Sequence, residues 1–455
     1  MKADPRQTAL LILNSIDDGR AHLDAVLNRV LDEKTCKNLS ARDLRLIHAL
    51  VFGTLRWQIR IDRIIALFST TPIKKIDKRI LNILRLGIFQ ILFMSRIPDS
   101  AAVNTSVNMA SRVAPKWISG FVNGLLRNIA KNKDQINKKL SVTGIAHGIA
   151  IKYAFAEWIV NRWVKRFGAE NTELICNRMN LIPPLTLRVN MLKTDRERLA
   201  SLLEENGVPV EPTRYSPEGL LICGPCGPVT ALPGFSDGLF QVQDEAAQLV
   251  SQILCPAPGE TVLDACAGLG GKTAHIAQMM KDTGRIFAID KDADRLDALG
   301  KDMKRLGIKS VSAKQGDITD KDINLPMFDR ILVDAPCSGM GVIRRNPDIK
   351  LSASQKRLAS LGARQLNILN SAARFLAPGG ILVFAVCSIE PEETEDVRNA
   401  FLSRQPNFHP DIGSGEIKAP VSSIINENGC LFTFPHLYDM DGFFIARFKK
   451  KEQKA

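Results

Sequence analysis

The most constraining feature of this sequence is a regular alternation of β-rich and helical segments that begins near residue 255. Crossovers between parallel strands need connections of about helix length, so this alternation predicts a parallel sheet with helices on both faces. We therefore predict an α/β, Rossmann-like domain over residues 241–450. Its strands are expected at 261–267, 285–290, 310–317, 330–334 and 380–387, with a closing pair at 431–434 and 442–448.

The rest of the chain predicts two further modules, so the expected fold is multidomain. Residues 1–142 carry apolar residues at helical spacing, which predicts an all-α bundle. Residues 143–240 add short β-rich runs at 185–190, 211–215 and 219–223, which predict a small α+β module. Within that module, Thr194 and Glu197 have the spacing of a capping box and predict the start of a helix.

The net charge of +13 comes from the first third of the chain. Residues 1–150 hold 24 Lys and Arg against 11 Asp and Glu, whereas the remainder holds 37 of each. A compact basic domain joined to a neutral one favours binding of a polyanion by the first part. A lysine-rich helical surface without such a partner is the alternative, and charge alone leaves it open.

Other bulk features predict a cytoplasmic protein without a membrane anchor. The most apolar stretch, residues 80–94, is interrupted by polar side chains and is too short to cross a bilayer. Asp4 and Pro5 precede the first apolar residues, unlike a signal peptide. The nine cysteines are odd in number and scattered, which suits a reducing compartment better than a disulfide framework.

A glycine-rich loop follows the first strand of the α/β domain. Glycines let the backbone turn sharply and approach a ligand at the head of the next helix. A phosphate-binding loop would need Gly in place of Cys266, and a dinucleotide-binding loop would need Gly in place of Thr273. The loop therefore predicts a nucleotide-like ligand without specifying it. The candidate contacts are Cys266, Ala267, Gly268, Leu269, Gly270, Gly271 and Lys272.

Acidic residues stand at the ends of the following strands. Asp290 ends the second strand, Asp317 follows the third, and Asp334 ends the fourth. Because the carboxyl ends of parallel strands open on one crevice, we expect these side chains around one ligand. Asp290 suits ribose hydroxyls, and Asp317 suits an adenine amino group. S-Adenosylmethionine fits, because it is a nucleoside without phosphate, although each acid alone could be a helix cap or a solvated turn.

Two cysteines end neighbouring strands beside this crevice. Cys337 lies in Asp334-Ala335-Pro336-Cys337, and Cys387 ends the fifth strand. A thiolate that adds to C6 of cytosine makes C5 nucleophilic enough to take a methyl group, and Asp334 is the candidate acid beside the ring. Either cysteine alone would be read as a small buried residue. The pair beside a methyl donor predicts catalysis, but both thiols meet the spatial requirement for the nucleophile.

Together these motifs resemble the bacterial 16S rRNA cytosine-C5 methyltransferases of the RsmB (Sun/Fmu) type, in the NOL1/NOP2/Sun family, over nearly the whole chain. The helical part resembles the RNA-binding factor NusB. The resemblance implies a class I methyltransferase fold for 241–450, an RNA methyltransferase activity of the EC 2.1.1 class, S-adenosyl-L-methionine as cofactor, and 16S rRNA or its small-subunit precursor as partner. Further matching segments are 121–124, 240–245, 345–348 and 441–444.

The resemblance also implies residue roles. Cys387 corresponds to the nucleophile, Cys337 to the cysteine that assists breakdown of the adduct, and Asp290, Asp317 and Asp334 to cofactor positions. The chain departs from the family in two places. Gly268-Leu269 replaces Ala-Pro in the loop, and Val386 replaces a threonine before Cys387, so any role of that hydroxyl is absent.

Other functions would each require a different set of residues. An exocyclic-amine methyltransferase favours an Asn/Asp-Pro-Pro-aromatic motif, and a DNA C5 methyltransferase does not need Cys387. A non-catalytic RNA-binding assembly factor is the alternative outside enzymes. Cys223 and Cys226 have redox spacing, but Gly227-Pro228 follows where a helix is required, and the six dispersed histidines predict no metal site. We expect a monomer, and no motif names the nucleotide.

Overall fold

The computed structural model describes residues 4–18, 23–32 and 39–452, so Cys36 lies outside the described residues. The chain forms two compact units. The helical unit comprises Met1–Leu181 and Ile343–Ser352, and the second unit comprises Ile182–Val342 and Ala353–Ala455. Among the described helices, none is long and apolar enough to cross a membrane.

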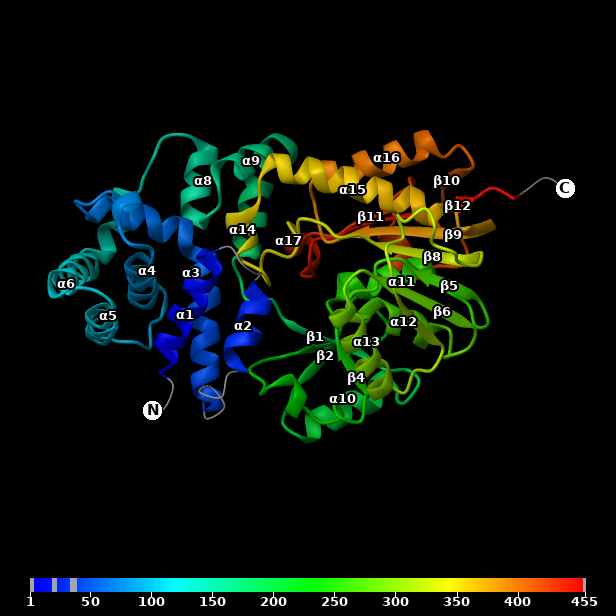
Figure 1. Ribbon diagram of the computed structural model, residues 1–455, viewed down its shortest axis with the longest axis horizontal. Helices are drawn as coiled ribbons and strands as arrows, with labels where there is room; N and C mark the ends of the chain where they lie inside the picture. Colours follow the sequence, from blue (N-terminus) through cyan, green and yellow to red (C-terminus); the bar gives the residue numbers. More distant parts are fainter. Residues whose placement is uncertain (1–3, 19–22, 33–38, 453–455) are drawn as a thin grey trace. The chain divides into compact units, whose positions relative to one another are not determined.

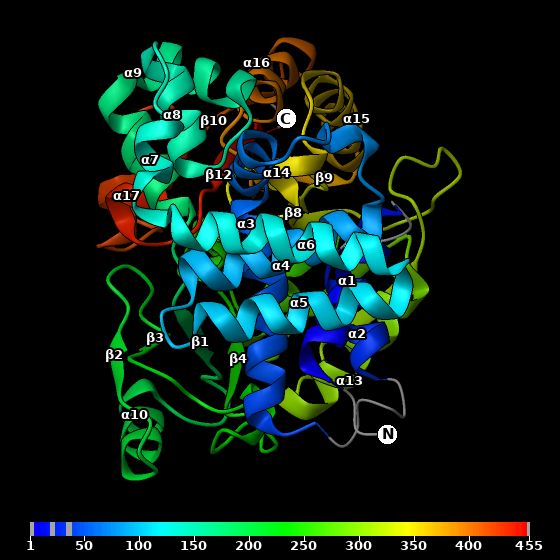
Figure 2. The same cartoon turned by 90° about the vertical axis from the view of Figure 1, so that its left-hand side faces the viewer.

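The helical unit confirms the predicted bundle. Its helices turn apolar faces into one core, and α4, α5 and α6 lie side by side (Figure 2). The longest, α3, begins with a capping box in which Ser40 and Asp43 bond each other's backbone N–H. The elements are α1 (Pro5–Asp17), α2 (Leu23–Leu31), α3 (Ala41–Phe68), α4 (Lys78–Phe93), α5 (Asp99–Val113), α6 (Lys116–Lys131), α7 (Ile136–Lys139), α8 (Ile145–Tyr153), α9 (Glu157–Met179) and α14 (Ile349–Ser352).

A buried lysine holds the late segment Ile343–Ser352 in this unit. Lys350 donates to the backbone oxygen of Arg56 at 3.1 Å and to Asn180 Oδ1 at 2.5 Å. Its ammonium also lies 3.8 Å from the centre of the Phe155 ring. Burial lowers the pKa of Lys350 well below its usual value. Oxygens and an aromatic face thus offset the cost of burying this amine.

The predicted α+β module is a four-stranded antiparallel sheet in the second unit, with strand order β2-β3-β1-β4. Its helix α10 (Arg196–Glu205) is capped by Asp195, which accepts from the backbone N–H of Arg198. The predicted cap at Thr194 was therefore wrong by one residue, because the Asp195 carboxylate accepts the N–H of Arg198 from the next position. The strands are β1 (Leu185–Val189), β2 (Val210–Pro212), β3 (Gly219–Ile222) and β4 (Phe240–Val242).

The predicted α/β domain contains an eight-stranded sheet with the order β10-β12-β9-β8-β5-β6-β7, and β11 pairs with β12. The five neighbouring strands β9, β8, β5, β6 and β7 are parallel, whereas β12 runs antiparallel to β9. The strands are β5 (Thr261–Asp264), β6 (Arg285–Asp290), β7 (Val311–Gln315), β8 (Phe328–Asp334), β9 (Leu376–Val386), β10 (Phe408–Pro410), β11 (Cys430–Phe432) and β12 (Phe444–Lys450).

Helices cover both faces of this sheet (Figure 1). Alternate strand residues point to opposite faces, so Leu332 of β8 joins one core, while Ile331 and Val333 join the other. The first face carries α11 (Glu245–Leu254), α12 (Gly271–Met279) and α13 (Ala293–Leu306), and the second carries α15 (Gln355–Ala373) and α16 (Glu395–Arg404). The short α17 (Pro435–Tyr438) precedes β12.

Gly362 allows α15 to pack directly on a neighbouring turn, because a Cβ there would lie 2.0 Å from the backbone oxygen of Glu392. We expect Gly362→Ala to lower the free energy of unfolding by about 1–3 kcal/mol through overpacking. Gly300→Ala in α13 is the matched control. A Cβ at Gly300 meets no described atom within 4 Å, and alanine favours a helix by about 1 kcal/mol. Urea unfolding measures both, and equal stabilities would contradict this packing.

Candidate active site

The glycine-rich loop joins β5 to α12. Gly268 and Gly270 have φ angles of +54° and +82°, and a Cβ at Gly270 would lie 2.6 Å from Leu299 Cγ. Glycine is therefore needed at position 270 for both conformation and space. The N–H of Ala267 donates to the backbone oxygen of Ile289 at 2.9 Å, so the loop lies against the end of β6.

The carboxylates predicted around the crevice have different partners. Asp290 accepts the N–H of Gly268 at 2.8 Å, which ties it to the loop. A carboxylate offers about four acceptor positions, so Asp290 can still accept from ligand hydroxyls. Asp317 pairs with Lys291 at 2.5 Å. Burial acts to raise the pKa of Asp317, but hydrogen bonds from Lys291 and Thr319 outweigh it and lower the pKa below its usual value.

Lys272 turns from the loop towards the fourth strand. Its ammonium lies 2.6 Å from Asp334 Oδ2, and its side chain is 14% exposed. Burial acts to lower the pKa of Lys272, but Asp334, and after it Cys387, raise the pKa above its usual value. The structure thus groups Lys272 with Asp334 and Cys387, whereas the sequence had grouped it with the cofactor contacts. A contact with the cofactor stays a prediction.

The parallel pairing of β8 with β9 brings Cys337 and Cys387 together. Asp334 pairs with Ala385 across the strands, and the two Sγ atoms lie 3.2 Å apart. The hydrogen bond with Cys387 and burial raise the pKa of Cys337 well above its usual value. Cys337 therefore keeps its proton at neutral pH. Burial also raises the pKa of Cys266, which makes this loop cysteine a neutral thiol.

Sequence analysis missed a buried acid behind these cysteines. Glu393 is fully buried in the 3₁₀ turn Pro391–Glu393. Its carboxylate accepts the hydroxyl protons of Ser338 and Ser388, the residues that follow the two cysteines. The surrounding residues 390–396 are rich in Glu and resemble a solvated charge run. The repeated Cys-Ser at the two strand ends was the available signal.

The middle module also contributes a residue that the sequence did not indicate. Arg188 of β1 is fully buried and donates to the backbone oxygen of Gly271 at 2.7 Å and to Gln241 Oε1 at 2.7 Å. Burial lowers the pKa of Arg188 to about 9. Amide and peptide oxygens satisfy this buried cation. Through the bond to Gly271, Arg188 connects β1 to the start of α12.

The cysteines at 223 and 226 do not resemble a redox pair. The helix that follows them is the single 3₁₀ turn Val229–Ala231. Burial, with a contribution from Glu211, raises the pKa of Cys223, whereas an attacking redox thiol needs a lowered pKa.

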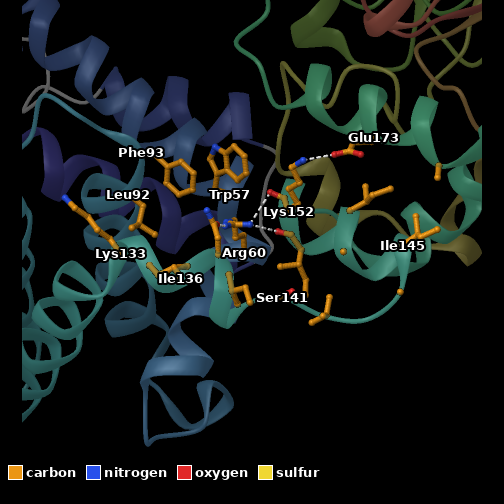
Figure 3. Close-up of a pocket in the computed structure, with 18 of the residues that line it drawn as sticks. Trp57, Arg60, Leu92, Phe93, Lys133, Ile136, Ser141, Ile145, Lys152 and Glu173 are labelled. Atoms are coloured by element: carbon orange, nitrogen blue, oxygen red, sulfur yellow. Dashed lines mark hydrogen bonds and ion pairs between the residues drawn. The ribbon is translucent and has the colours of Figure 1, made fainter.

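A hollow of about 860 Å³ lies within the helical unit (Figure 3). Trp57 and Phe93 stack on one side of it, with ring centres 4.7 Å apart. Arg60 donates to oxygens of neighbouring helices, and Lys152 pairs with Glu173 at 2.7 Å. The sequence-predicted site residues, all of them described, do not line this hollow. Its three cations, Arg60, Lys133 and Lys152, are bound by partners of the same unit, so the hollow gives no evidence for the chemistry above.

Comparisons with known proteins cover almost the whole chain. Residues 251–449 match the model of the family "16S rRNA methyltransferase RsmB/F". Residues 3–131 match the NusB family, and residues 155–230 match the ferredoxin-like domain of RsmF/B-like methyltransferases. These matches follow the order of the helical bundle, the small antiparallel sheet and the large sheet.

Full-length relatives agree with these matches. The probable ribosomal RNA small subunit methyltransferase B of Synechocystis is 36% identical over 98% of this chain and 99% of its own. Ribosomal RNA small subunit methyltransferase B of Pseudomonas syringae is 34% identical over 98% of this chain and 97% of its own. The crystal structure of PH0851 superposes with a TM-score of 0.81 at 27% identity, over 99% of this chain and all of that one.

A buried acid links the end of β5 to the start of α12, on either side of the glycine-rich loop. Asp264, the last residue of β5, is 1% exposed and accepts the hydroxyl proton of Thr273 at 2.7 Å. Burial raises the pKa of Asp264 from 3.8 to about 6.

We expect this acid to make unfolding pH-dependent. Between pH 4 and 6 the unfolded chain has lost the Asp264 proton while the folded chain keeps it, so stability falls as pH rises. Asn cannot ionise, so the free energy of unfolding of Asp264→Asn should rise relative to that of wild type by about 3 kcal/mol as the pH is raised from 4 to 7. Urea unfolding of both proteins at several pH values measures this difference. Parallel pH curves would rule it out.

Proposed function

Since the chain belongs to the RsmB/F family of 16S rRNA methyltransferases, we propose that it methylates C5 of a cytosine in 16S rRNA through a covalent bond between Cys387 and C6 of the base. Membership of this family shows that the protein is a ribosomal RNA methyltransferase. The proposed C5 chemistry is supported by the contact of Cys337 and Cys387, whose sulfur atoms lie 3.2 Å apart at the strand end that also holds Asp334.

S-Adenosyl-L-methionine is the proposed methyl donor, and it supplies an electrophilic methyl group when bound. Residues 266–271 with Asp290 and Asp317 would hold it. The only basic residue between 266 and 272 is Lys272, which is bound to Asp334. This arrangement suits a nucleoside ligand without phosphate, because phosphate-binding loops normally direct a lysine at the phosphates.

Cys387 is the proposed nucleophile because it corresponds to the nucleophile of the family that the sequence resembles, and the Cys337 thiol lies 3.2 Å from its sulfur. The Cys387 sulfur adds to C6, C5 of the resulting enamine takes the methyl group, and loss of the C5 proton expels the sulfur. Lys272, whose pKa is raised by Asp334 and Cys387 against the effect of burial, supplies a positive charge beside this sulfur. Asp334 is proposed to lie beside N3 and to accept a hydrogen bond from the amino group of the ring as the sulfur adds.

Cys337 is proposed to act in the second half of the reaction. The hydrogen bond with Cys387 is the first cause of its raised pKa. That hydrogen bond is lost once Cys387 is bonded to C6, so Cys337 then gives up its proton more easily. This change suits Cys337 as the group that assists removal of the C5 proton and breakdown of the adduct.

The other modules are proposed to select and hold the substrate. Residues 1–142, which carry the excess positive charge, are the proposed RNA-binding domain, residues 143–240 a linker module, and residues 241–450 the methyltransferase domain. We propose a monomer that acts in the cytoplasm, where its substrate is assembled. The substrate is 16S rRNA or the precursor particle that contains it.

Variants of the two cysteines test this mechanism. Cys387→Ala should lose methylation of 16S rRNA on the order of a thousand-fold or more, because it removes the nucleophile. Cys337→Ala should accumulate a covalent RNA adduct that survives denaturing electrophoresis. Cys223→Ala is the matched control and should behave as wild type. The assay follows radiolabelled methyl transfer to protein-free RNA and to small subunits, with mass spectrometry of the nucleoside formed.

The outcomes separate the alternatives. Full activity of Cys387→Ala would overturn the covalent mechanism. N4-methylcytidine or N6-methyladenosine as the product would replace the C5 assignment with exocyclic-amine methylation.

Cofactor binding is a second test. Asp290→Asn should weaken binding of S-adenosylmethionine by about 10- to 100-fold, because hydrogen bonds to a charged group contribute about 1.5–3 kcal/mol. Asp294→Asn, on the exposed side of α13, is the control. Equilibrium dialysis with labelled S-adenosylmethionine gives both constants. A wild-type protein that bound no S-adenosylmethionine would instead support a non-catalytic RNA-binding factor.

A further inference from the structure

We propose that Glu393 is the positioning residue that holds Cys337 and Cys387 against each other, by clamping the two turns that follow β8 and β9. This inference rests on the proposed function for its consequence in catalysis. Its geometric part stands on the contacts alone.

The clamp consists of direct hydrogen bonds to both turns. Glu393 Oε1 accepts the backbone N–H of Ser338 at 2.7 Å, and Oε2 accepts the Ser338 hydroxyl. The Ser388 hydroxyl donates to the same Oε2 at 2.5 Å. Each serine directly follows one of the cysteines, so a single carboxylate bridges the two turns that carry them.

The serines transmit this constraint to the backbone. Ser338 Oγ also accepts the N–H of Met340 at 3.3 Å, and Ser388 Oγ accepts the N–H of Glu390 at 3.3 Å. Each hydroxyl therefore joins the carboxylate to its own turn. The backbone N–H of Gly341 also donates to the Cys387 oxygen at 3.0 Å and links the two turns. This bond involves no side chain, so we assign the orientation of the cysteine side chains to the hydrogen bonds of Glu393.

The carboxylate itself cannot shift easily. Gln365 of α15 donates to Glu393 Oε1 at 3.1 Å. The preceding residue, Glu392, is pressed by α15 at Gly362, where even a Cβ would not fit. Contacts with α15 therefore hold the acid in place.

The choice of a carboxylate has a chemical reason. A carboxylate offers about four acceptor positions and can receive hydroxyl, backbone and amide protons together. A neutral amide presents donors to some of these groups. Burying a charge is costly unless it is fully hydrogen-bonded, and Glu393 and Ser388 are 0% exposed. The role of holding two reacting cysteines together explains why a buried carboxylate is present at this position despite the cost of its desolvation.

The first test measures the cysteine contact without RNA. Diamide oxidises two neighbouring thiols to a disulfide and takes up both protons and both electrons as it becomes a hydrazine. We expect Glu393→Ala to slow formation of the Cys337–Cys387 disulfide at least about tenfold, because the sulfurs lose their contact. Peptide mass spectrometry follows the disulfide. Glu245→Ala is the matched control, since Glu245 is also buried and accepts the backbone N–H of Ser216 at 2.9 Å.

The second test measures the catalytic consequence. In single-turnover methylation, Glu393→Ala should lose on the order of 100-fold in rate, with RNA affinity within about threefold of wild type, because a misplacement of about 1 Å has this effect. Glu393→Gln should recover part of the rate, since serine hydroxyls can turn and accept from an amide. In a Cys337→Ala background, Glu393→Ala should cost much less than in wild type, because the residue acts through the pair.

The results distinguish the two proposals. Wild-type disulfide formation in folded Glu393→Ala, or a rate no lower than that of Glu245→Ala, would overturn the positioning role. If Glu393→Ala does not fold, the Ser338→Ala/Ser388→Ala double variant removes the same hydroxyl contacts and should give the same two losses. An active Cys387→Ala would overturn the proposed function and leave the disulfide result intact.

Discussion

The parallel pairing of β8 with β9 is the contact on which the rest of the site depends. It sets Asp334 opposite Ala385, so the turns that leave both strands emerge side by side at one edge of the sheet. Two cysteines 50 residues apart in the chain thereby come to 3.2 Å. The loop from β5, which pairs with the other side of β8, then brings Lys272 to Asp334. A shift in the β8–β9 register would separate the two cysteines.

Buried polar groups stiffen this edge, each with a different arrangement. Lys272 and Asp334 form an ion pair, Glu393 accepts neutral donors, and Arg188 is held by amide and peptide oxygens. The hydrogen bond with Cys387 and burial raise the pKa of Cys337, whereas Asp334 raises the pKa of Lys272 against the effect of burial. The Cys337 thiol lies 3.2 Å from the Cys387 sulfur, so both are available at the same edge of the sheet.

The architecture was predictable because it follows from local periodicity. The pattern of alternating segments located the parallel strands, and 285–290 coincides with β6. The short edge strands β4 and β10 were missed, since three residues carry too little pattern. Composition also misled in places. Lys350 and Glu393 belong to types that are usually exposed, so a sequence reading places them on the surface, whereas tertiary partners allow both to be buried.

By itself the sequence determined the class of fold, the place of the glycine-rich loop, and the residue types that end each strand, because these depend on neighbours in the chain. It also marked Cys337 and Cys387 as a pair without distinguishing them. The contact between the two thiols, the turn of Lys272 towards Asp334 and the hydrogen bonds of Glu393 were decided by tertiary structure. Each depends on burial and on partners that come from distant segments, and a linear pattern does not encode those distances.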